Sequence, residues 1–381
     1  MTRTLRILHV LHAFDPGGLE NGIVNIVNNS PPHLVHELCL MTHAGDFMNR
    51  FTRSVACHEL NKGTGNDVRV IFRLRELFNR RKIDVVHTRN WAGFDGVLAS
   101  CLTAQPVLIH GEHGRDIGDP AGLIWRRNVA RRALAFRTRK FVAVSKELQS
   151  WLLSTVRIPE KKLVLIPNGV DTERFRPGRN FALREELGIV DSEFVIGTVG
   201  RLDPIKNHIG LINAVQRLRT DNINIRLVIV GEGPERPRLN EAISRFEGQY
   251  PPILLGYRPD VHIVYQSFDA FALNSLAEGM SNTLLEAMSC GLPVICTRVG
   301  GSLDLVDHLV TGVLVRSGDE KALAEAIRDL AVSADSRALI GGNARRFVIS
   351  NCSLDQMVHR YVDLYETANG SESGRPVSRG I

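Results

Sequence analysis

The sequence predicts an α/β protein in which strands and helices alternate. Short apolar runs that end in glycine-rich or polar turns recur along the chain, and helical patterns follow most of them. The chain has 381 residues, of which 44% are hydrophobic, which is enough for substantial cores and about two domains. The alternation itself indicates an α/β architecture.

Composition and cysteine usage exclude several protein classes. The six cysteines are scattered without paired spacing, so neither a disulfide framework nor a zinc site is predicted, and a reducing compartment fits best. The N-terminal run 4–12 lacks a small-residue cleavage site and predicts a strand rather than a signal peptide. No apolar run reaches about eighteen residues, so no transmembrane helix is expected. We expect a cytoplasmic protein whose membrane contact, if it has one, is peripheral and at the inner face.

Positive charge is concentrated in the first half of the chain. The formal net charge is +6, of which residues 1–171 carry +9 and the remainder −3. The densest basic run, residues 125–140, places Val129, Ala133 and Phe136 on one helical stripe among arginines. This run is either a solvated helix or a membrane-surface helix, on which each basic residue contributes about 1 kcal/mol near anionic lipid. Nucleic acid is not an expected partner, because aromatic residues are few and are not interleaved with the basic run.

The first strand of the chain leads into a glycine turn. An apolar strand is predicted at 7–11, and a helical face begins at Ile23. Between them, Gly17 and Gly18 allow the backbone to approach a phosphate group closely.

Two further strands of the first half end in polar residues. Arg89 follows the strand at 84–88, and it is either a surface residue or a cation for an anionic acceptor such as a lipid phosphate. His113 follows the strand at 107–110 between glycines, where α/β sheets place ligand groups. The remaining predicted elements of this half are a helix at 70–81, a strand at 141–145, a helix at 146–153 and a strand and turn at 164–171.

The second half opens with a strand that ends in two cations. The strand at 194–200 is followed by Arg201 and Lys206, and preplaced cations stabilise a departing diphosphate. A glycine turn at 231–233 follows the strand at 226–230, but no third glycine completes a dinucleotide fingerprint.

The stretch 274–301 organises the second half. A buried strand at 269–273, a turn at 279–282 and a helix at 283–289 put the amides of residues 280–283 at a helix N-terminus, which suits an anion. Glu278 and Glu286 can face one ligand from this loop and helix, and carboxylates accept hydrogen bonds from vicinal hydroxyls. Further helical patterns are predicted at 320–330, 335–348 and 354–365.

These motifs together resemble retaining glycosyltransferases of family 4, which have the GT-B fold. Glu278 and Glu286 match the E-x7-E motif, Arg201 and Lys206 match G-R-L-x-x-x-K, and Gly17 to Glu20 match G-G-x-E. The resemblance covers almost the whole chain except the tail. It implies two Rossmann-like domains facing a cleft, at 1–172 and 180–348, a crossover helix region at 349–368 that returns to the first domain, and a disordered tail at 369–381.

The resemblance also implies roles for individual residues. Arg89 stands where relatives often have a histidine, which puts that histidine role in doubt for this chain. Catalytic roles fall to Glu278, His113, Arg201 and Lys206. Binding of the nucleotide-sugar falls to Gly18, Arg201, Lys206, Arg258, Glu278, Met280, Ser281, Asn282, Thr283 and Glu286, and acceptor contacts fall to Glu20, Arg89 and His113.

The implied reaction is transfer of a sugar, with retained configuration, from a nucleotide-sugar to a glycan or lipid-linked acceptor. A UDP-sugar is favoured as donor, exopolysaccharide or cell-surface glycan synthesis as the setting, and no metal or other cofactor is expected. Within the family, the chain is similar to sugar transferases of exosortase/PEP-CTERM exopolysaccharide loci. Two alternatives stay open: a sugar-nucleotide epimerase of the same fold, and a non-enzymatic basic protein that binds the membrane periphery.

Overall fold

The computed structural model describes residues 3–15, 17–63, 65, 67–115, 119, 122–219, 221 and 223–370. The chain divides into two compact units, residues 1–168 with 355–381, and residues 169–354. The sequence placed the corresponding domain limits at 172, 180 and 348. The predicted disordered tail lies, from residue 371 onward, outside the described residues.

The first unit is built on a seven-stranded parallel sheet. Its strand order is β3-β2-β1-β4-β5-β6-β7. Inward-facing residues alternate along the strands, so α2 and α3 pack on the face that contains Leu8 and Val10, and α1 packs on the face that contains Leu38 and Leu40. The strands are β1 (Leu5–Leu11), β2 (Leu34–Leu40), β3 (Ala56–Glu59), β4 (Val85–Arg89), β5 (Val107–Glu112), β6 (Thr138–Ala143) and β7 (Leu163–Leu165). The α-helices are α1 (Gly18–Asn29), α2 (Arg69–Arg81), α3 (Phe94–Cys101), α4 (Trp125–Leu134), α5 (Lys146–Trp151) and, from the end of the chain, α14 (Leu354–Ala368).

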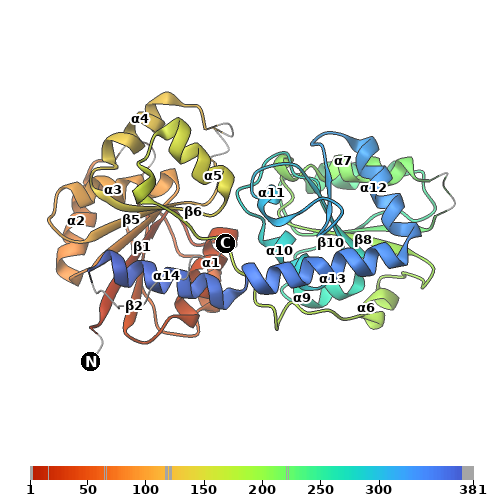
Figure 1. Cartoon of the computed structure of the whole chain (residues 1–381), viewed down its shortest axis with the longest axis horizontal. Coiled ribbons are helices and arrows are strands. Elements are labelled where there is room, and N and C mark those ends of the chain that lie inside the picture. The colour runs from red at the N-terminus through yellow and green to blue at the C-terminus, as the bar shows by residue number, and fades with distance from the viewer. Residues whose placement is uncertain are drawn as a thin grey trace. The chain divides into compact units, whose positions relative to one another are not determined.

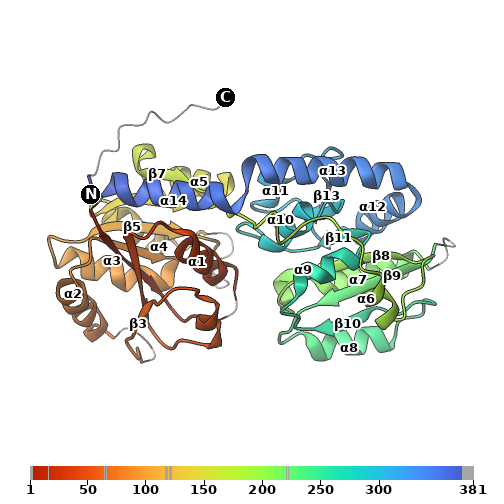
Figure 2. The same ribbon diagram turned by 90° about the horizontal axis from the view of Figure 1, so that it is seen from below.

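The last helix, α14, packs along the first unit, as the predicted crossover requires (Figures 1 and 2). Its buried face carries Tyr361 and Tyr365, which are 2% and 0% exposed. The Tyr365 hydroxyl lies 2.9 Å from Nδ1 of His87 on β4. Nε2 of His33 lies 2.8 Å from Oε1 of Glu366, the next residue of the same helix. The helix is therefore held by both aromatic packing and polar contacts.

The second unit is built on a six-stranded parallel sheet in the order β10-β9-β8-β11-β12-β13. One face of this sheet packs against α7, α8 and α12 around Ile196, Ile229 and Ile327. The strands are β8 (Phe194–Val199), β9 (Ile225–Val230), β10 (Ile253–Gly256), β11 (Ala270–Leu273), β12 (Val294–Thr297) and β13 (Val313–Val315). The α-helices are α6 (Phe181–Glu186), α7 (His208–Arg217), α8 (Arg236–Ser244), α9 (Val261–Val264), α10 (Asn282–Ser289), α11 (Ser302–Leu305), α12 (Glu320–Val332) and α13 (Ala334–Asn351).

Both sheets have the doubly wound order of a Rossmann-like domain. In each, the first strand of the unit lies between the second and the fourth, so the winding direction reverses beside it. Open α/β sheets bind ligands outside the carboxyl ends of the strands at this reversal. The site in the second unit is therefore expected beside the ends of β8 and β11, and in the first beside the ends of β1 and β4.

The basic run is not one continuous helix, which corrects the stripe predicted over residues 125–140. The helix ends at Leu134, and strand β6 begins at Thr138. Arg137 donates hydrogen bonds to the carbonyls of Ser100, Thr103 and Pro106, at 2.8, 3.3 and 2.9 Å. Pairing of β6 with β5 and these three contacts override the helical pattern.

Candidate functional site

Two loops that are far apart in the sequence meet at the reversal point of the second unit. The loop after β8 and the loop after β11 are joined by a hydrogen bond from the Leu276 amide to the Ile205 carbonyl, at 2.7 Å. The Asn274 side chain donates to the Asn207 carbonyl at 3.1 Å. This contact brings the cations of the first loop to the carboxylate of the second.

Lys206 and Glu278 form the centre of this site. The Lys206 ammonium lies 2.5 Å from Oε1 of Glu278, and the Ser275 hydroxyl donates to the same oxygen at 2.6 Å. The two charged side chains are only 20% and 9% exposed. A partly buried charge pair of this kind is held in a defined position, so both groups are ready to contact a ligand.

Arg201 lies on the same loop but is turned outward. Its Nε donates to Oδ2 of Asp203 at 2.7 Å, and its side chain is 64% exposed. The two cations, Arg201 and Lys206, and the two carboxylates, of Asp203 and Glu278, sum to zero charge. A diphosphate at this site therefore has to draw one or both cations away from their carboxylates, and the α10 N-terminus adds positive potential.

Glu286, the second glutamate of the E-x7-E motif, is held in place by the hydroxyl of the buried Tyr265. The Tyr265 hydroxyl lies 2.9 Å from Oε2 of Glu286 and 3.1 Å from the Thr283 carbonyl. Burial, and secondarily Glu286, raise the pKa of Tyr265 well above its usual value, so the hydroxyl stays a donor. The Ser281 hydroxyl accepts from the Leu284 amide and caps α10. Glu286 is thus oriented on the first turns of a capped helix.

Glycine turns let the loops of this site approach each other. A side chain at Gly300 would place its Cβ 1.8 Å from the Glu278 carbonyl, and Gly300 has a φ of +48°. A Cβ at Gly231 would lie 1.9 Å from the Gly200 carbonyl. The Gly301 amide donates to the Gly279 carbonyl at 2.9 Å. The backbone around Glu278 is therefore supported by a neighbouring turn that only glycine allows.

The Arg258 side chain is already paired within its own loop. Its Nε and terminal nitrogen donate to the two carboxylate oxygens of Asp260, at 2.8 and 2.7 Å. This bidentate pair fixes the loop that follows β10. The expectation that the backbone of Arg258 meets the nucleobase remains a prediction.

In the first unit, the glycine turn after β1 opens helix α1 as predicted. Gly17 is the N-cap residue and Gly18 the first residue of the helix. A Cβ at Gly17 would lie 2.2 Å from Oε2 of Glu20, so the Glu20 carboxylate folds back over the turn. A carboxylate in the first turn of a helix is favoured by the helix dipole.

His113 lies at the carboxyl end of β5; the residue as a whole is half-buried, and Nε2 of its ring is buried. Its amide donates to the Asn90 side chain at 2.8 Å. Burial, followed by the nearby Arg89 charge, lowers the pKa of His113 to about 3, so the ring is neutral at neutral pH. Its Nε2 has no partner within the described residues. A neutral imidazole with one unused nitrogen is suited to a hydrogen bond with a hydroxyl.

Arg89 is neither a surface residue nor an accessible cation, which corrects both expectations for this position. The side chain is 1% exposed and points into the unit. Its guanidinium donates to Nδ1 of His9 at 2.8 Å and lies 3.4 Å from Nδ1 of His87. An acceptor contact through the Arg89 side chain is therefore wrong for this structure.

The structure brings some predicted residues together and adds others that sequence reasoning missed. Lys206 and Glu278 are in contact. Arg201 lies on the loop that carries Lys206, and Glu286 lies on α10, which follows the loop that carries Glu278. Gly18, Glu20 and His113 belong to the first unit. The residues that were missed are Asp203, Tyr265, Ser275, His9, His36 and His87. Only the position of Asp203, between the two motif cations, gave any sequence signal.

None of the helices in the described part of the chain has the length and apolar character needed to cross a membrane. The same part of the chain contains no group of three or more His, Cys, Asp or Glu side chains arranged to hold a metal ion.

Comparison with known proteins places both halves of the chain in glycosyltransferase families. Residues 16–174 match the family Glycosyltransferase Family 4, and residues 180–347 match Glycosyl transferases group 1. Together these matches cover most of the described residues. They assign the chain to the transferases rather than to either alternative considered above.

Individual relatives agree with this assignment. The chain is 31% identical to a D-inositol 3-phosphate glycosyltransferase of Stackebrandtia nassauensis, over 78% of the chain and 72% of that protein. It is 28% identical to the Escherichia coli UDP-Gal:alpha-D-GlcNAc-diphosphoundecaprenol alpha-1,3-galactosyltransferase, over 78% and 79%. The crystal structure of Anabaena HepE with UDP superposes with a TM-score of 0.82 at 22% identity, over 95% of the chain and all of HepE. The chain therefore belongs to the group 1 and family 4 glycosyltransferases and has their GT-B fold.

Proposed function

We propose that the protein transfers a sugar, with retained anomeric configuration, from a UDP-sugar to a glycan or lipid-linked acceptor. The observation that carries this proposal is the Lys206–Glu278 pair beside the capped start of α10, at the reversal point of the second sheet. In this pair, the Lys206 ammonium can bind a diphosphate, and the Glu278 carboxylate can accept hydrogen bonds from sugar hydroxyls. The names of the E. coli relative and of the HepE complex support UDP as the nucleotide.

In the proposed reaction, the acceptor oxygen attacks the anomeric carbon on the face from which the diphosphate leaves. The new C–O bond forms as the bond to the diphosphate oxygen breaks, and the electron pair of that bond stays on the diphosphate. The acceptor proton passes to the departing phosphate oxygen. Lys206 and Arg201 stabilise the growing negative charge, together with the α10 N-terminus.

The carboxylates position the donor in this scheme. Glu286 accepts hydrogen bonds from the ribose hydroxyls, and Glu278 accepts one from the donor sugar. Met280, Ser281, Asn282 and Thr283 supply backbone contacts to the donor. His113 accepts or donates a hydrogen bond at the acceptor hydroxyl as a neutral ring, and Glu20 lies on the acceptor side. The reaction needs no metal in this scheme, because the cations and amides supply the charge.

Exopolysaccharide or cell-surface glycan synthesis is the proposed setting, and a polyprenyl diphosphate sugar is the first acceptor to test. The diphosphoundecaprenol acceptor named for the E. coli relative supports this choice. Assignment to an exosortase/PEP-CTERM locus remains a prediction from the sequence.

The test is a donor panel of UDP-, GDP- and ADP-sugars with a polyprenyl diphosphate sugar acceptor, followed by NMR of the product. We expect transfer from a UDP-sugar and an α-linkage from an α-linked donor. Wild type is compared with Lys206→Met and with the matched control Lys321→Met, whose side chain is 81% exposed on α12. An inverted linkage would overturn the retaining mechanism, and equal activity of Lys206→Met would overturn the site assignment.

A peripheral membrane surface is a second part of the proposal. The residues around the start of α4 and its following turn expose large apolar side chains: Leu123 (69%), Trp125 (66%), Val129 (47%) and Phe136 (76%). Arg126 and Arg127 lie on the same helix, with their guanidinium groups over the rings of Trp125 and Trp91. We propose that this surface, the α4 surface, rests on anionic lipid, since apolar side chains and arginines together match that interface.

Not all of the basic run contributes to the α4 surface. Arg131 is buried, donates to Oε1 of Glu112 at 2.6 Å and lies between the rings of Trp91 and Trp151. Sedimentation with phosphatidylglycerol and phosphatidylcholine vesicles tests the surface. Trp125→Ser with Phe136→Ser is expected to abolish binding to the anionic vesicles, whereas the control Phe181→Ser, at a side chain that is 61% exposed at the start of α6, keeps it. Equal binding by all three proteins would contradict the proposal.

A further inference from the structure

A pocket of about 390 Å³ opens in the first unit at the start of strand β2. It is lined by apolar side chains, among them Val27, Pro32 and Leu34, and by His36, Arg53 and Ser54. The strands are parallel, and Leu34 pairs with Leu5 at the beginning of β1. The pocket therefore lies at the amino ends of the strands, on the edge of the sheet opposite to the loops that carry Gly18 and His113.

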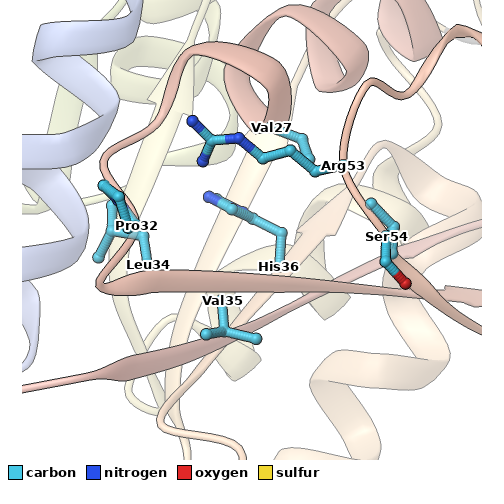
Figure 3. A pocket seen from close by; sticks show the side chains of 8 residues that line it. Val27, Pro32, Leu34, Val35, His36, Arg53 and Ser54 are labelled. Carbon is cyan, nitrogen blue, oxygen red and sulfur yellow. The ribbon is translucent and has the colours of Figure 1, made fainter.

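Two nitrogen-bearing side chains define the polar part of the pocket. Figure 3 shows the His36 ring and the Arg53 guanidinium above β2, with their nitrogen atoms directed the same way. Arg53 donates one hydrogen bond to the Ser30 carbonyl at 2.6 Å. Within the described residues it has no carboxylate partner, so most of its donor capacity is unused.

The protonation of His36 follows from a chain of hydrogen bonds that begins at Arg89. Arginine has only donors, so Nδ1 of His9, 2.8 Å from the Arg89 guanidinium, must accept. Burial, then Arg89, lowers the pKa of His9 well below its usual value. The neutral His9 ring therefore carries its proton on Nε2 and donates it to Nδ1 of His36, 2.9 Å away.

The proton of the His36 ring lies at the wall of the pocket. Burial, followed by the charges of Arg89 and Arg53, lowers the pKa of His36 to about 3, so this ring is also neutral. Because its Nδ1 accepts from His9, its single proton lies on Nε2. His36 is 5% exposed, and its Nε2 has no partner among the described residues. The pocket thus contains a buried N–H donor without an acceptor.

The charges around this donor favour an anion over a neutral guest. Arg89 is buried without a carboxylate partner in the described part of the chain, and its charge polarises the His9–His36 chain toward the pocket. Arg53 adds a second positive charge at the wall. The other aromatic group that faces His36 is Tyr365 of α14, whose ring centre is 6.1 Å away.

We propose that this pocket binds a small oxyanion, such as a phosphate, sulfate or carboxylate group, through the Nε2–H of His36 and the guanidinium of Arg53. The apolar wall formed by Val27, Pro32 and Leu34 takes a short hydrocarbon part of the same ligand. The pocket shares no residue with the proposed transferase site, so its occupation does not depend on the proposed reaction.

The experiment is NMR of the full chain with ¹⁵N-labelled histidine, titrated with sulfate, phosphate, butyrate and, as an ionic control, chloride. We expect the His36 ring to carry its proton on Nε2 and to shift saturably with the oxyanions but not with chloride. Arg53→Gln, which keeps a donor for the Ser30 carbonyl, should weaken sulfate binding about 10-fold or more. The control Arg75→Gln removes the same charge from an exposed position on α2 and should leave it unchanged.

Two further arms decide how the ligand is held. Sulfate affinity should stay constant between about pH 6 and 8, since a neutral donor, not an imidazolium, binds the anion. Tighter binding of butyrate than of acetate would identify the apolar wall as part of the site, whereas equal affinities would restrict the proposal to the oxyanion group. A proton on Nδ1 of His36, or no saturable shift with any oxyanion, would overturn the proposal.

Discussion

Replacement of Glu286 by alanine tests the donor site most directly. The carboxylate is fixed by the Tyr265 hydroxyl at 2.9 Å, and in the proposed complex it accepts hydrogen bonds from the ribose. A hydrogen bond to a charged group contributes about 1.5–3 kcal/mol, so the loss of about 2 kcal/mol corresponds to roughly 30-fold weaker UDP binding. Isothermal titration calorimetry with UDP, GDP and ADP measures this change.

Two further variants separate the carboxylate from its support. Tyr265→Phe keeps the carboxylate but removes its donor, so we expect less than about a 10-fold loss of UDP affinity and a lower free energy of unfolding by about 1 kcal/mol. Glu185→Ala removes a carboxylate from the exposed face of α6 and serves as the control.

Ligand-induced stabilisation gives an independent reading of the same variants. UDP at about 100 times its dissociation constant should stabilise wild type by about 2.7 kcal/mol, which a melting curve resolves. The same UDP concentration should stabilise Glu286→Ala by less than about 1 kcal/mol, because it is then only about three times the dissociation constant of the variant. Unchanged UDP affinity in Glu286→Ala would refute the role of the E-x7-E motif in this chain.

Three other outcomes are expected. Lys206→Arg should retain more transferase activity than Lys206→Met, because it keeps the charge beside Glu278; equal kcat values would argue against a role for that charge. Gly300→Ala should lower the free energy of unfolding by at least about 2 kcal/mol and raise the donor KM, because a Cβ there meets the Glu278 carbonyl and φ is +48°. Gly342→Ala is the control: a Cβ there meets nothing, so chemical denaturation should show a free energy of unfolding that is higher by about 0.5–1 kcal/mol. Burial lowers the pKa of His36 to about 3 and of His208 to about 4, and it lowers the pKa of His9 and His87 well below the ordinary value of 6.5. The unfolded chain therefore binds more protons than the folded chain below about pH 6.5. Stability is therefore complete above about pH 6.5 and should fall on acidification, by at most about 1.4 kcal/mol per pH unit for each histidine; equal denaturation midpoints at about pH 7 and 5 would contradict this assignment.

Sequence patterns alone predict the fold class and the positions of the site loops. Apolar runs of strand length alternate with helical patterns. Two of the predicted site residues, Lys206 after β8 and His113 after β5, follow the carboxyl ends of strands. This works because polar motifs placed after parallel strands share one edge of the sheet. The motif spacings then identified the family, which the comparisons confirm.

The partners of these residues could not be predicted from the sequence and follow from the folded arrangement of the chain. Lys206 and Glu278 are 72 positions apart, and Tyr265 reaches Glu286 from a separate helical segment. Neither pairing has a periodic signal in the sequence. Long-range contacts depend on how the strands are ordered in the sheet, and that order is set by packing of the whole unit.

The same reason explains the two corrections. Arg89 sits at a strand end, which suggested an accessible cation, but buried histidines on β1 and β4 supply acceptors that hold it inside. The basic run has helical spacing through Phe136, but pairing of β6 with β5 ends the helix at Leu134. Local pattern predicts where a side chain stands along its element, whereas burial and hydrogen bonding across the sheet decide which way it faces and what it can bind.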